Sequence, residues 1–349
     1  MANQRELARL LGLSQSAVSL ALRGDHSIPL ETQERVREAA RVHGYFPHPH
    51  VAALMQKVRS GGAVRDLGCL AIVADAADEA GWFTHPAYRG QYGAIVARAH
   101  LRGFRPEPFF LRAPGMSPAR LDRVLHSRGI TAVILAAPRR EGGAPLRIRW
   151  ERYACVTSGY TWGEPAVDRI VPHHRHHVGM AFGELTRRGY RRIGFCLPTS
   201  AQPRVDENWL SGWLLCQHHL PARRRIPLFT GSPWDATRDD FARWHERWRP
   251  DAILSLRGNE LPWMDALGLR AGREVAMVCL YPPERPGITH IDENNVVIGE
   301  MLCDLALAHL VHNEKGIPAH PRLIVVEGSW VEGASAPPRC GEPARAGME

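Results

Sequence analysis

Three polar side chains stand together near the amino terminus, in the stretch LLGLSQSAVSLALRG (residues 10–24). Ser14, Gln15 and Ser16 carry hydroxyl and amide groups that donate and accept hydrogen bonds. A glutamine amide can pair with N6 and N7 of adenine, and serine hydroxyls can bond to bases or phosphates. These residue types therefore offer recognition of base edges, provided that a helix presents them to a DNA groove.

Helical spacing of the neighbouring residues predicts the elements that would position them. Apolar residues recur at helical spacing in three successive sets between residues 4 and 42. Gly12 separates the first two sets, Ser14 is a natural N-cap for the second helix, and Gly24 closes it. We expect a helix-turn-helix whose second helix buries Val18, Ala21 and Leu22. Its outward residues are Gln15, Ser16, Ser19 and Leu20, with Arg23 at the far end near a phosphate.

Further along the chain, the pattern changes twice. Pro47 and Pro49 block continuation of the third helix, and residues 51–58 predict a fourth helix too short to hold alone in water. From residue 67, apolar strands alternate with amphipathic helices in two successive rounds, which predicts parallel sheets flanked by helices. The expected strands include RIPLFTG (225–231) and a closing segment, PRLIVVEGSW (321–330).

Pro-rich breaks at 163–165 and 282–287 suggest where the chain crosses between two α/β units. The predicted fold is an N-terminal all-α helix-turn-helix domain with a hinge helix, followed by an α/β core of two doubly wound parallel-sheet lobes. The expected ranges are 1–46 for the helix-turn-helix domain, 47–66 for the hinge helix and linker, and 67–332 for the core. Within the core we expect lobe 1 over about 67–163 and 289–316, and lobe 2 over about 166–285 and 318–332, with 333–349 as a flexible tail.

The composition allows a polyanionic partner without identifying one. The 349 residues hold 44 Lys plus Arg against 36 Asp plus Glu, a formal net charge of +8, and the excess is spread along the chain. The seven cysteines include no C-x-x-C pair, which predicts reduced, buried thiols. Since no apolar stretch approaches the ~18 residues of a membrane span and no signal peptide is evident, we expect a cytoplasmic protein with no membrane partner.

Motifs for catalysis or metal binding are sparse. The chain has no G-x-S-x-G, G-x-x-x-x-G-K-[ST] or H-E-x-x-H sequence, so nothing in it calls for an enzyme or a cofactor. In HHRHH, His173 and His177 lie one helical turn apart and could chelate a cation. Because no cysteine or carboxylate cluster completes a site in sequence, we favour a solvated helix start and assign no metal ligand.

Several stretches together resemble one known family. ELARLLGLSQSAVSLALRG, IPLETQERVREAARVHGYFPHP and VAALM follow, in order, the N-terminal pattern of the lactose/galactose repressor (LacI/GalR) family. The resemblance continues through GELTRRGYRRIGF and ITHIDENNVVIGEMLCDLALAHL, to about residue 332. It implies a periplasmic-binding-protein-like core and a homodimer that binds a pseudopalindromic operator in double-stranded DNA. The alternative for residues 1–45 is an ordinary helical hairpin that caps the larger domain.

The resemblance also implies DNA contacts by position. The implied contacts are Ser14, Gln15, Ser16, Ser19, Leu20, Arg23, Thr32, Tyr45 and Leu54. Leu54 takes the place of the hinge-helix leucine that wedges into the minor groove and kinks the duplex. Leu20 stands where the family often has arginine, so the operator should depend less on the guanine that such an arginine grips.

A small-molecule effector is expected in the cleft at the carboxyl ends of the strands. Candidate lining residues that follow strands are Trp82, Phe83, Tyr88, Asp206, Trp209, Trp234 and Asn259. Aromatic faces with a few polar groups suit a sugar or another flat, partly apolar ligand, although each residue could equally serve packing. The family's sugar-gripping arginine aligns with Trp209, which argues against a typical monosaccharide.

The sequence therefore predicts a ligand-responsive, sequence-specific transcriptional regulator, with repression as the favoured direction, and not an enzyme. Two other classes stay open. One is a cytosolic solute-binding sensor that acts through protein contacts, and the other is an enzyme with a divergent site in the cleft. An operator-shift assay at several salt concentrations separates them from a regulator.

Overall fold

The computed structural model describes residues 4–22, 25, 27–43, 68–83, 86–138, 146–231 and 236–339. The chain divides into two compact units, Met1–Gly68 and Cys69–Glu349. Each unit has buried apolar clusters of its own. The hinge helix expected over 51–58 lies outside the described residues.

The first unit is a bundle of three helices: α1 (Gln4–Leu11), α2 (Gln15–Leu22) and α3 (Leu30–Val42). Their shared core consists of Leu7, Ala8, Val18, Ala21, Val36 and Ala40, which confirms the three apolar sets. At the end of α1, Gly12 adopts a φ of +67°, where glycine has no steric penalty. The N–H groups of Gly12 and Leu13 donate to the carbonyls of Arg9 and Ala8, so the helix ends in a Schellman turn that directs the chain into α2.

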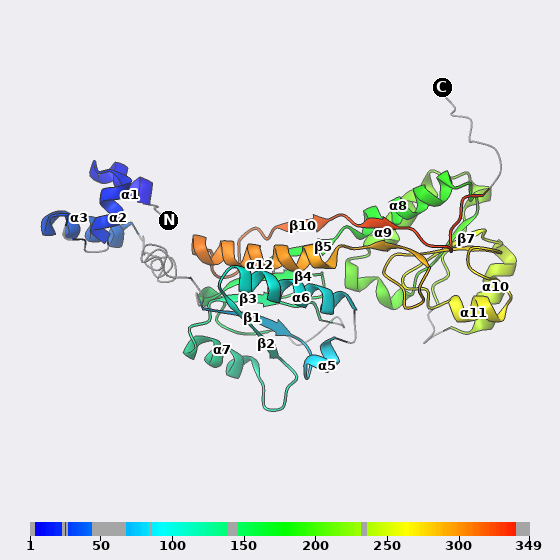
Figure 1. Ribbon diagram of the computed structural model, residues 1–349, viewed down its shortest axis with the longest axis horizontal. Coiled ribbons are helices and arrows are strands. Elements are labelled where there is room, and N and C mark those ends of the chain that lie inside the picture. The colour runs from blue at the N-terminus through cyan, green and yellow to red at the C-terminus, as the bar shows by residue number, and fades with distance from the viewer. Residues whose placement is uncertain are drawn as a thin grey trace, which may run out of the picture. The chain divides into compact units, whose positions relative to one another are not determined.

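The second unit holds two sheets, each covered by helices on both faces (Figure 1). The first sheet is parallel throughout. Its strands, in spatial order, are β10 (Leu323–Val326), β5 (Asp168–Pro172), β4 (Ala154–Ser158), β3 (Ala132–Leu135), β1 (Cys69–Ala74) and β2 (Arg105–Phe110).

Strand side chains alternate between the two faces of this sheet. Leu70 and Ile72 of β1 pack in one cluster with α6 (Pro86–Leu101) and α12 (Asn295–His312). Ala71 and Val73 pack in the opposite cluster with α7 (Pro118–Ser127). A short helix, α5 (Glu79–Trp82), follows β1. Figure 1 shows α6 and α12 side by side over the sheet.

Helix α12 has the length and composition of a membrane span, with 18 residues and a mean hydropathy of 1.3. The expectation that no apolar stretch approaches that length is therefore wrong for this segment. In the fold, α12 packs against α6, β3, β4 and β5. Its buried residues include Leu302, Cys303 and Ala306, so it is the central core helix of the first lobe.

The second sheet has four parallel strands and one antiparallel edge strand. In spatial order they are β11 (Ser329–Val331), β9 (Thr289–Asp292), β8 (Ala276–Cys279), β7 (Ala252–Ser255) and β6 (Ile193–Cys196). One face packs against α8 (His174–Arg187) and α9 (Asn208–His218), and the other against α10 (Arg238–Trp248) and α11 (Leu261–Ala266).

Two strand expectations need correction. The strand expected at 225–231 reduces to one bridge between Cys196 and Phe229, because Pro227 has no N–H to extend a ladder. The closing segment 321–330 is not one strand. It splits into β10 and β11, which belong to different sheets.

The part of the expected tail that the structure describes, residues 333–339, is folded. Ser335 is buried, and its hydroxyl donates to the carbonyl of Met277 at 2.6 Å and accepts from the N–H of Thr289 at 2.8 Å. This hydroxyl satisfies two backbone groups of the second lobe, so the tail expectation is wrong for this segment.

The sheets also correct the expected lobe ranges. β5 and β10 belong to the first lobe and β9 to the second, each opposite to expectation. The chain therefore crosses between lobes after β5, after β9 and after β10. The Pro-rich breaks are not the crossings between lobes that the sequence suggested. Residues 163–165 join β4 to β5 within one sheet, and residues 282–287 join β8 to β9 within the other.

Candidate functional site

The helix-turn-helix presents the polar start of α2 outward. The Oγ atom of Ser14 accepts a hydrogen bond from the N–H of Ala17 at 3.1 Å, which makes Ser14 the N-cap. Ser14, Gln15 and Ser16 are exposed, whereas Val18 and Ala21 are fully buried. The first turn of α2 holds no acidic residue, so its N-terminal N–H groups suit a phosphate.

The other expected DNA contacts divide into two groups. Ser19 and Leu20 on α2, and Thr32 in the first turn of α3, are partly exposed. Arg23, Tyr45 and Leu54 lie outside the described residues. Leu22, expected on the buried face of α2, is partly exposed at the edge of the core.

In the second unit, a cavity of about 70 Å³ lies between the two lobes, at the carboxyl ends of their strands. Its first-lobe lining is Ala87, Tyr88, Gln91, Ala137, Pro138, Ser158, Gly159, Thr161, Pro172 and Asn295. From the second lobe and the crossing segments come His174, Arg204, Val205, Trp209, Tyr281 and Glu293. A neighbouring hollow of about 190 Å³ shares Ala87, Tyr281 and Asn295 with it.

Two of the seven effector candidates, Tyr88 and Trp209, line this cavity. Trp82 is only 4% exposed and stacks on Phe83, with ring centroids 5.2 Å apart, so both serve the first-lobe core. Asp206 is exposed just beyond the cavity-lining Val205.

The last two candidates are Asn259 and Trp234. Asn259 borders a separate hollow of about 320 Å³ in the second lobe. Trp234 lies outside the described residues.

Several cavity residues were missed from the sequence although a signal for them existed. His174 follows β5, Tyr281 follows β8 and Glu293 follows β9, so each stands just after a strand as the ligand-site rule requires. His174 and Glu293 were not predicted because the crossings between the lobes were expected at other positions. Both residues lie where the chain passes from one sheet to the other. Gln91 and Asn295 come from helices and carried no such signal.

Aromatic rings form one wall of the cavity. The His174 ring lies 4.9 Å from that of Trp209, and Trp209 lies 5.6 Å from Tyr281, both in edge-to-face geometry. Burial raises the pKa of the Tyr281 phenol. The opposite wall is polar, since Nε2 of Gln91 donates to Oδ1 of Asn295 at 2.7 Å.

Two buried histidines, His174 and His177, lie close to the buried carboxyl group of Glu293. Nδ1 of His174 lies 3.2 Å from Oε1 of Glu293. Burial raises the pKa of the Glu293 carboxyl and lowers the pKa of His177 to about 3. The low dielectric of this region therefore favours a neutral His177 imidazole.

Hydrogen bonds join the three crossing segments, because the third segment accepts from each of the other two. The N–H of His173 donates to the carbonyl of Val326 at 2.8 Å, and Nδ2 of Asn294 donates to the carbonyl of Glu327 at 2.7 Å. Gly328 permits this close approach, because a Cβ there would lie 2.7 Å from both the Asp292 carbonyl oxygen and His177 Nε2. Any change in the angle between the lobes must pass through these segments.

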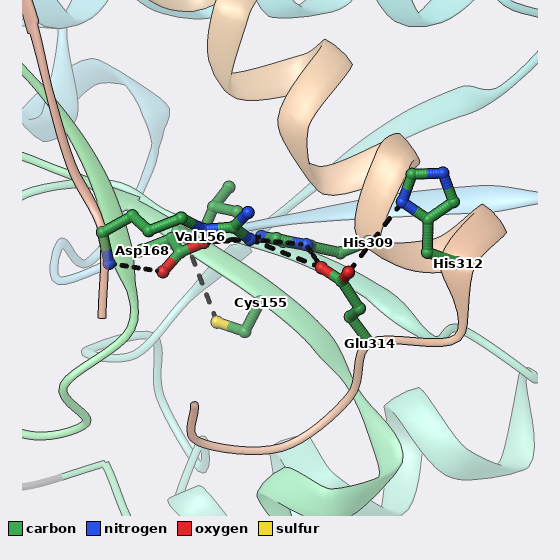
Figure 2. Close-up of polar contacts among 7 residues, drawn as sticks. Cys155, Val156, Asp168, His309, His312 and Glu314 are labelled. Atoms are coloured by element: carbon green, nitrogen blue, oxygen red, sulfur yellow. Dashed lines mark hydrogen bonds and ion pairs between the residues drawn. The ribbon is translucent and has the colours of Figure 1, made fainter. Parts of the chain in front are cut away.

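A network of ionisable side chains links β5, α12 and the start of β10 in the first lobe (Figure 2). The buried Asp168 carboxylate accepts from Nε of Arg322 at 2.6 Å and lies 3.1 Å from His309 Nε2. His309 Nδ1 in turn lies 2.6 Å from Glu314. The hydrogen bond to Asp168 raises the pKa of the Arg322 guanidinium. Because Asp168 begins β5, the network lies at the end of the sheet away from the cavity.

The cysteines agree only in part with the expectation of buried thiols, because Cys155, Cys196, Cys279 and Cys303 are buried whereas Cys69 and Cys216 are partly exposed. Six of them lie within the described residues, and all six are free. Burial raises the pKa of Cys69 and Cys216 to about 11 and that of Cys303 to about 12. These thiols are therefore protonated and unreactive at neutral pH.

Comparison with known proteins finds similarity to a domain family and to a transcriptional regulator. Residues 182–336 match the periplasmic binding protein-like domain family. Over 46 residues the chain is 52% identical to the HTH-type transcriptional regulator AglR of Rhizobium meliloti (strain 1021), a match that spans 13% of each protein.

Solved structures extend the comparison to almost the whole chain. The fold is similar to that of the transcriptional regulator CelR in complex with cellobiose, with a TM-score of 0.56 and 19% identity over 96% of this chain and 100% of that one. It is also similar to the Lac repressor dimer bound to operator and the anti-inducer ONPF, with a TM-score of 0.53 and 17% identity over 96% and 99%. The fold is thus a set of N-terminal helices followed by a two-lobed, periplasmic-binding-protein-like core.

Proposed function

We propose that the chain is a transcriptional regulator of the LacI family, a cytoplasmic repressor that binds a pseudopalindromic DNA operator as a homodimer. The outward polar edge of α2, formed by Ser14, Gln15 and Ser16, is the observation that carries this proposal. It supplies hydrogen-bonding groups where a recognition helix needs them. LacI-family regulators are not enzymes, so the cleft is assigned to ligand binding.

The proposed effector is a small molecule that sits between the lobes, such as a sugar or a related compound. The aromatic wall of Trp209 and Tyr281 would pack against an apolar ligand face, and Gln91 and Asn295 would bond its polar groups. A ligand that binds one lobe arrangement better than the other shifts operator affinity by at most the ratio of its two affinities.

Selection from a random DNA pool tests the proposal. The purified full-length chain should retain related sequences with two-fold symmetry. In a gel-shift titration, its affinity should fall as salt rises while the preference for those sequences persists. A retained pool without sequence preference would contradict sequence-specific binding.

Two substitutions then separate base recognition from backbone contact. Gln15→Ala should weaken binding about 10-fold or more at particular base pairs and relax the preference there. Arg23→Ala should weaken binding to all sequences alike, because a phosphate contact carries no sequence information. Equal losses on every sequence for both variants would refute the assignment of α2 as the recognition helix.

A further inference from the structure

Two groups of histidine and glutamate side chains lie at the crossing segments between the lobes. One consists of His174, His177 and Glu293, and the other of His173, His176 and Glu327. Within each group, one ligand atom per residue lies within 4.8 Å of the others. The fold thus pairs the histidines of HHRHH three residues apart, and brings to each pair a carboxylate from a segment more than 100 residues away. In the sequence, no carboxylate stood near HHRHH to complete a metal site, and the fold supplies one to each pair.

The first group is buried, whereas the second reaches the surface. His174, His177 and Glu293 are 5%, 0% and 1% exposed. Neither ring nitrogen of His177 has a hydrogen-bond partner in the part of the chain that the structure describes. A neutral imidazole has both a donor and an acceptor, and leaving them unpaired in the interior costs free energy. The charge of a buried carboxylate such as Glu293 likewise has to be neutralised, by a proton or by a neighbouring cation.

We propose that His174, His177 and Glu293 bind one divalent transition-metal cation of the Zn²⁺ class. Two imidazole nitrogens and one carboxylate oxygen are a donor set that Zn²⁺ accepts in proteins. With metal–ligand bonds of about 2.0–2.1 Å, neighbouring ligands of a tetrahedral ion lie about 3.3 Å apart. The separation of 3.2 Å between His174 Nδ1 and Glu293 Oε1 matches this spacing.

The bound ion would lie next to the cleft and would connect the crossing segments between the lobes. His174 and Glu293 both line the cavity, so the fourth coordination position is reached from the cleft. His174 and His177 follow the first crossing, Glu293 lies in the second, and Gly328 of the third packs against His177. The ion therefore cross-links the segments through which the lobes must move. This site is independent of the proposed operator binding.

Titration of the full-length chain, first stripped with a chelator, tests the site. We expect one tightly bound Zn²⁺ per chain by isothermal calorimetry, and visible absorption bands of a tetrahedral site when Co²⁺ replaces it. Zn²⁺ should raise the Tm of the wild-type chain, and chelator should reverse the rise. Since loss of an outer hydrogen-bond partner alone costs 10–100-fold in affinity, His177→Gln should weaken binding by about 100-fold or more.

His176→Gln is the matched control, because it lies on the same helix but belongs to the partly exposed group. It should leave the tight site intact. Should His177→Gln fail to fold, Glu293→Gln offers a second variant, and the wild-type Tm rise needs no variant. Absence of saturable binding to the wild-type chain, or tight binding that survives His177→Gln and Glu293→Gln, would overturn the proposal. The proposal would also be overturned if His176→Gln lost tight Zn²⁺ binding while His177→Gln and Glu293→Gln kept it.

Discussion

At the scale of single residues, Gln33 holds the turn that follows α2. It lies on α3, is only 4% exposed, and its Nε2 donates to the carbonyls of Asp25 and Ile28 at 3.0 and 2.9 Å. These bonds fix the loop that sets α3 against the proposed recognition helix. A polar residue in an amphipathic helix is usually placed at the surface from sequence, so this role was visible only in the fold.

Replacing Gln33 with alanine should destabilise the first unit by about 1–3 kcal/mol, because two carbonyls lose their partner. Hydrogen exchange of the amides in residues 4–43 measures this loss directly. Glu34→Ala, at an exposed position of the same helix, is the control and should change little. Unchanged exchange rates in the Gln33 variant would show that the loop does not depend on the amide.

Glu332 contributes to the stability of the fold by an amount that depends on pH. Its carboxylate accepts hydrogen bonds from Arg188 at 2.5 Å and from the indole N–H of Trp330 at 2.9 Å, and these bonds lower its pKa from 4.5 to about 2. The folded pKa lies below the unfolded one, so the carboxylate stabilises the fold above pH 4.5. That stabilisation is lost as the pH falls from 4.5 towards 2.

Glu332→Gln should therefore lower the free energy of unfolding by a constant amount above about pH 5, and by a shrinking amount at lower pH. Urea unfolding of the two chains across this range measures the difference. Glu246→Gln, at an exposed position on α10, serves as control. A difference that does not change with pH would contradict the role assigned to the carboxylate.

At the scale of elements, glycines decide how closely α6 and α12 pack. A Cβ at Gly299 of α12 would lie 2.4 Å from the carbonyl oxygen of Gln91 and 2.8 Å from Cβ of Ala94. A Cβ at Gly93 of α6 would meet nothing within 4 Å. The same substitution should thus have opposite effects in the two helices.

Gly299→Ala should cost about 1–3 kcal/mol of stability because the helices must move apart. Gly93→Ala should stabilise by about 0.5–1 kcal/mol, since alanine loses less backbone entropy in a helix. Chemical denaturation of both variants measures the two effects. Destabilisation of similar size in both would mean that the close approach is not what Gly299 provides.

Element types could be predicted from sequence better than their assignment to lobes. Apolar periodicity identified the three helices of the first unit and the alternation of strands and helices in the second, because each such element buries a regular face. Periodicity carries no information on which sheet a strand joins, so β5, β9 and β10 were placed in the wrong lobes. The same limit concealed two residues of the cavity, since His174 and Glu293 face it only because the chain crosses there.

At the scale of the whole molecule, the two units have separate cores. A chain that begins at Cys69 should therefore keep the thermal transition of the α/β core, while the full-length chain shows the additional, weaker melting of residues 1–43. Scanning calorimetry compares the two chains. A core transition that shifts by more than a few degrees would reveal energetic dependence on the first unit.

The division of β10 and β11 between the two sheets has a consequence for synthesis on the ribosome. Both strands come from residues 323–331, so they emerge from the exit tunnel after all the other described strands of the two sheets. Each sheet lacks an edge strand until then, so neither lobe can be completed ahead of the other. A premature stop codon just before this segment would leave two unfinished sheets with bare edges open to aggregation.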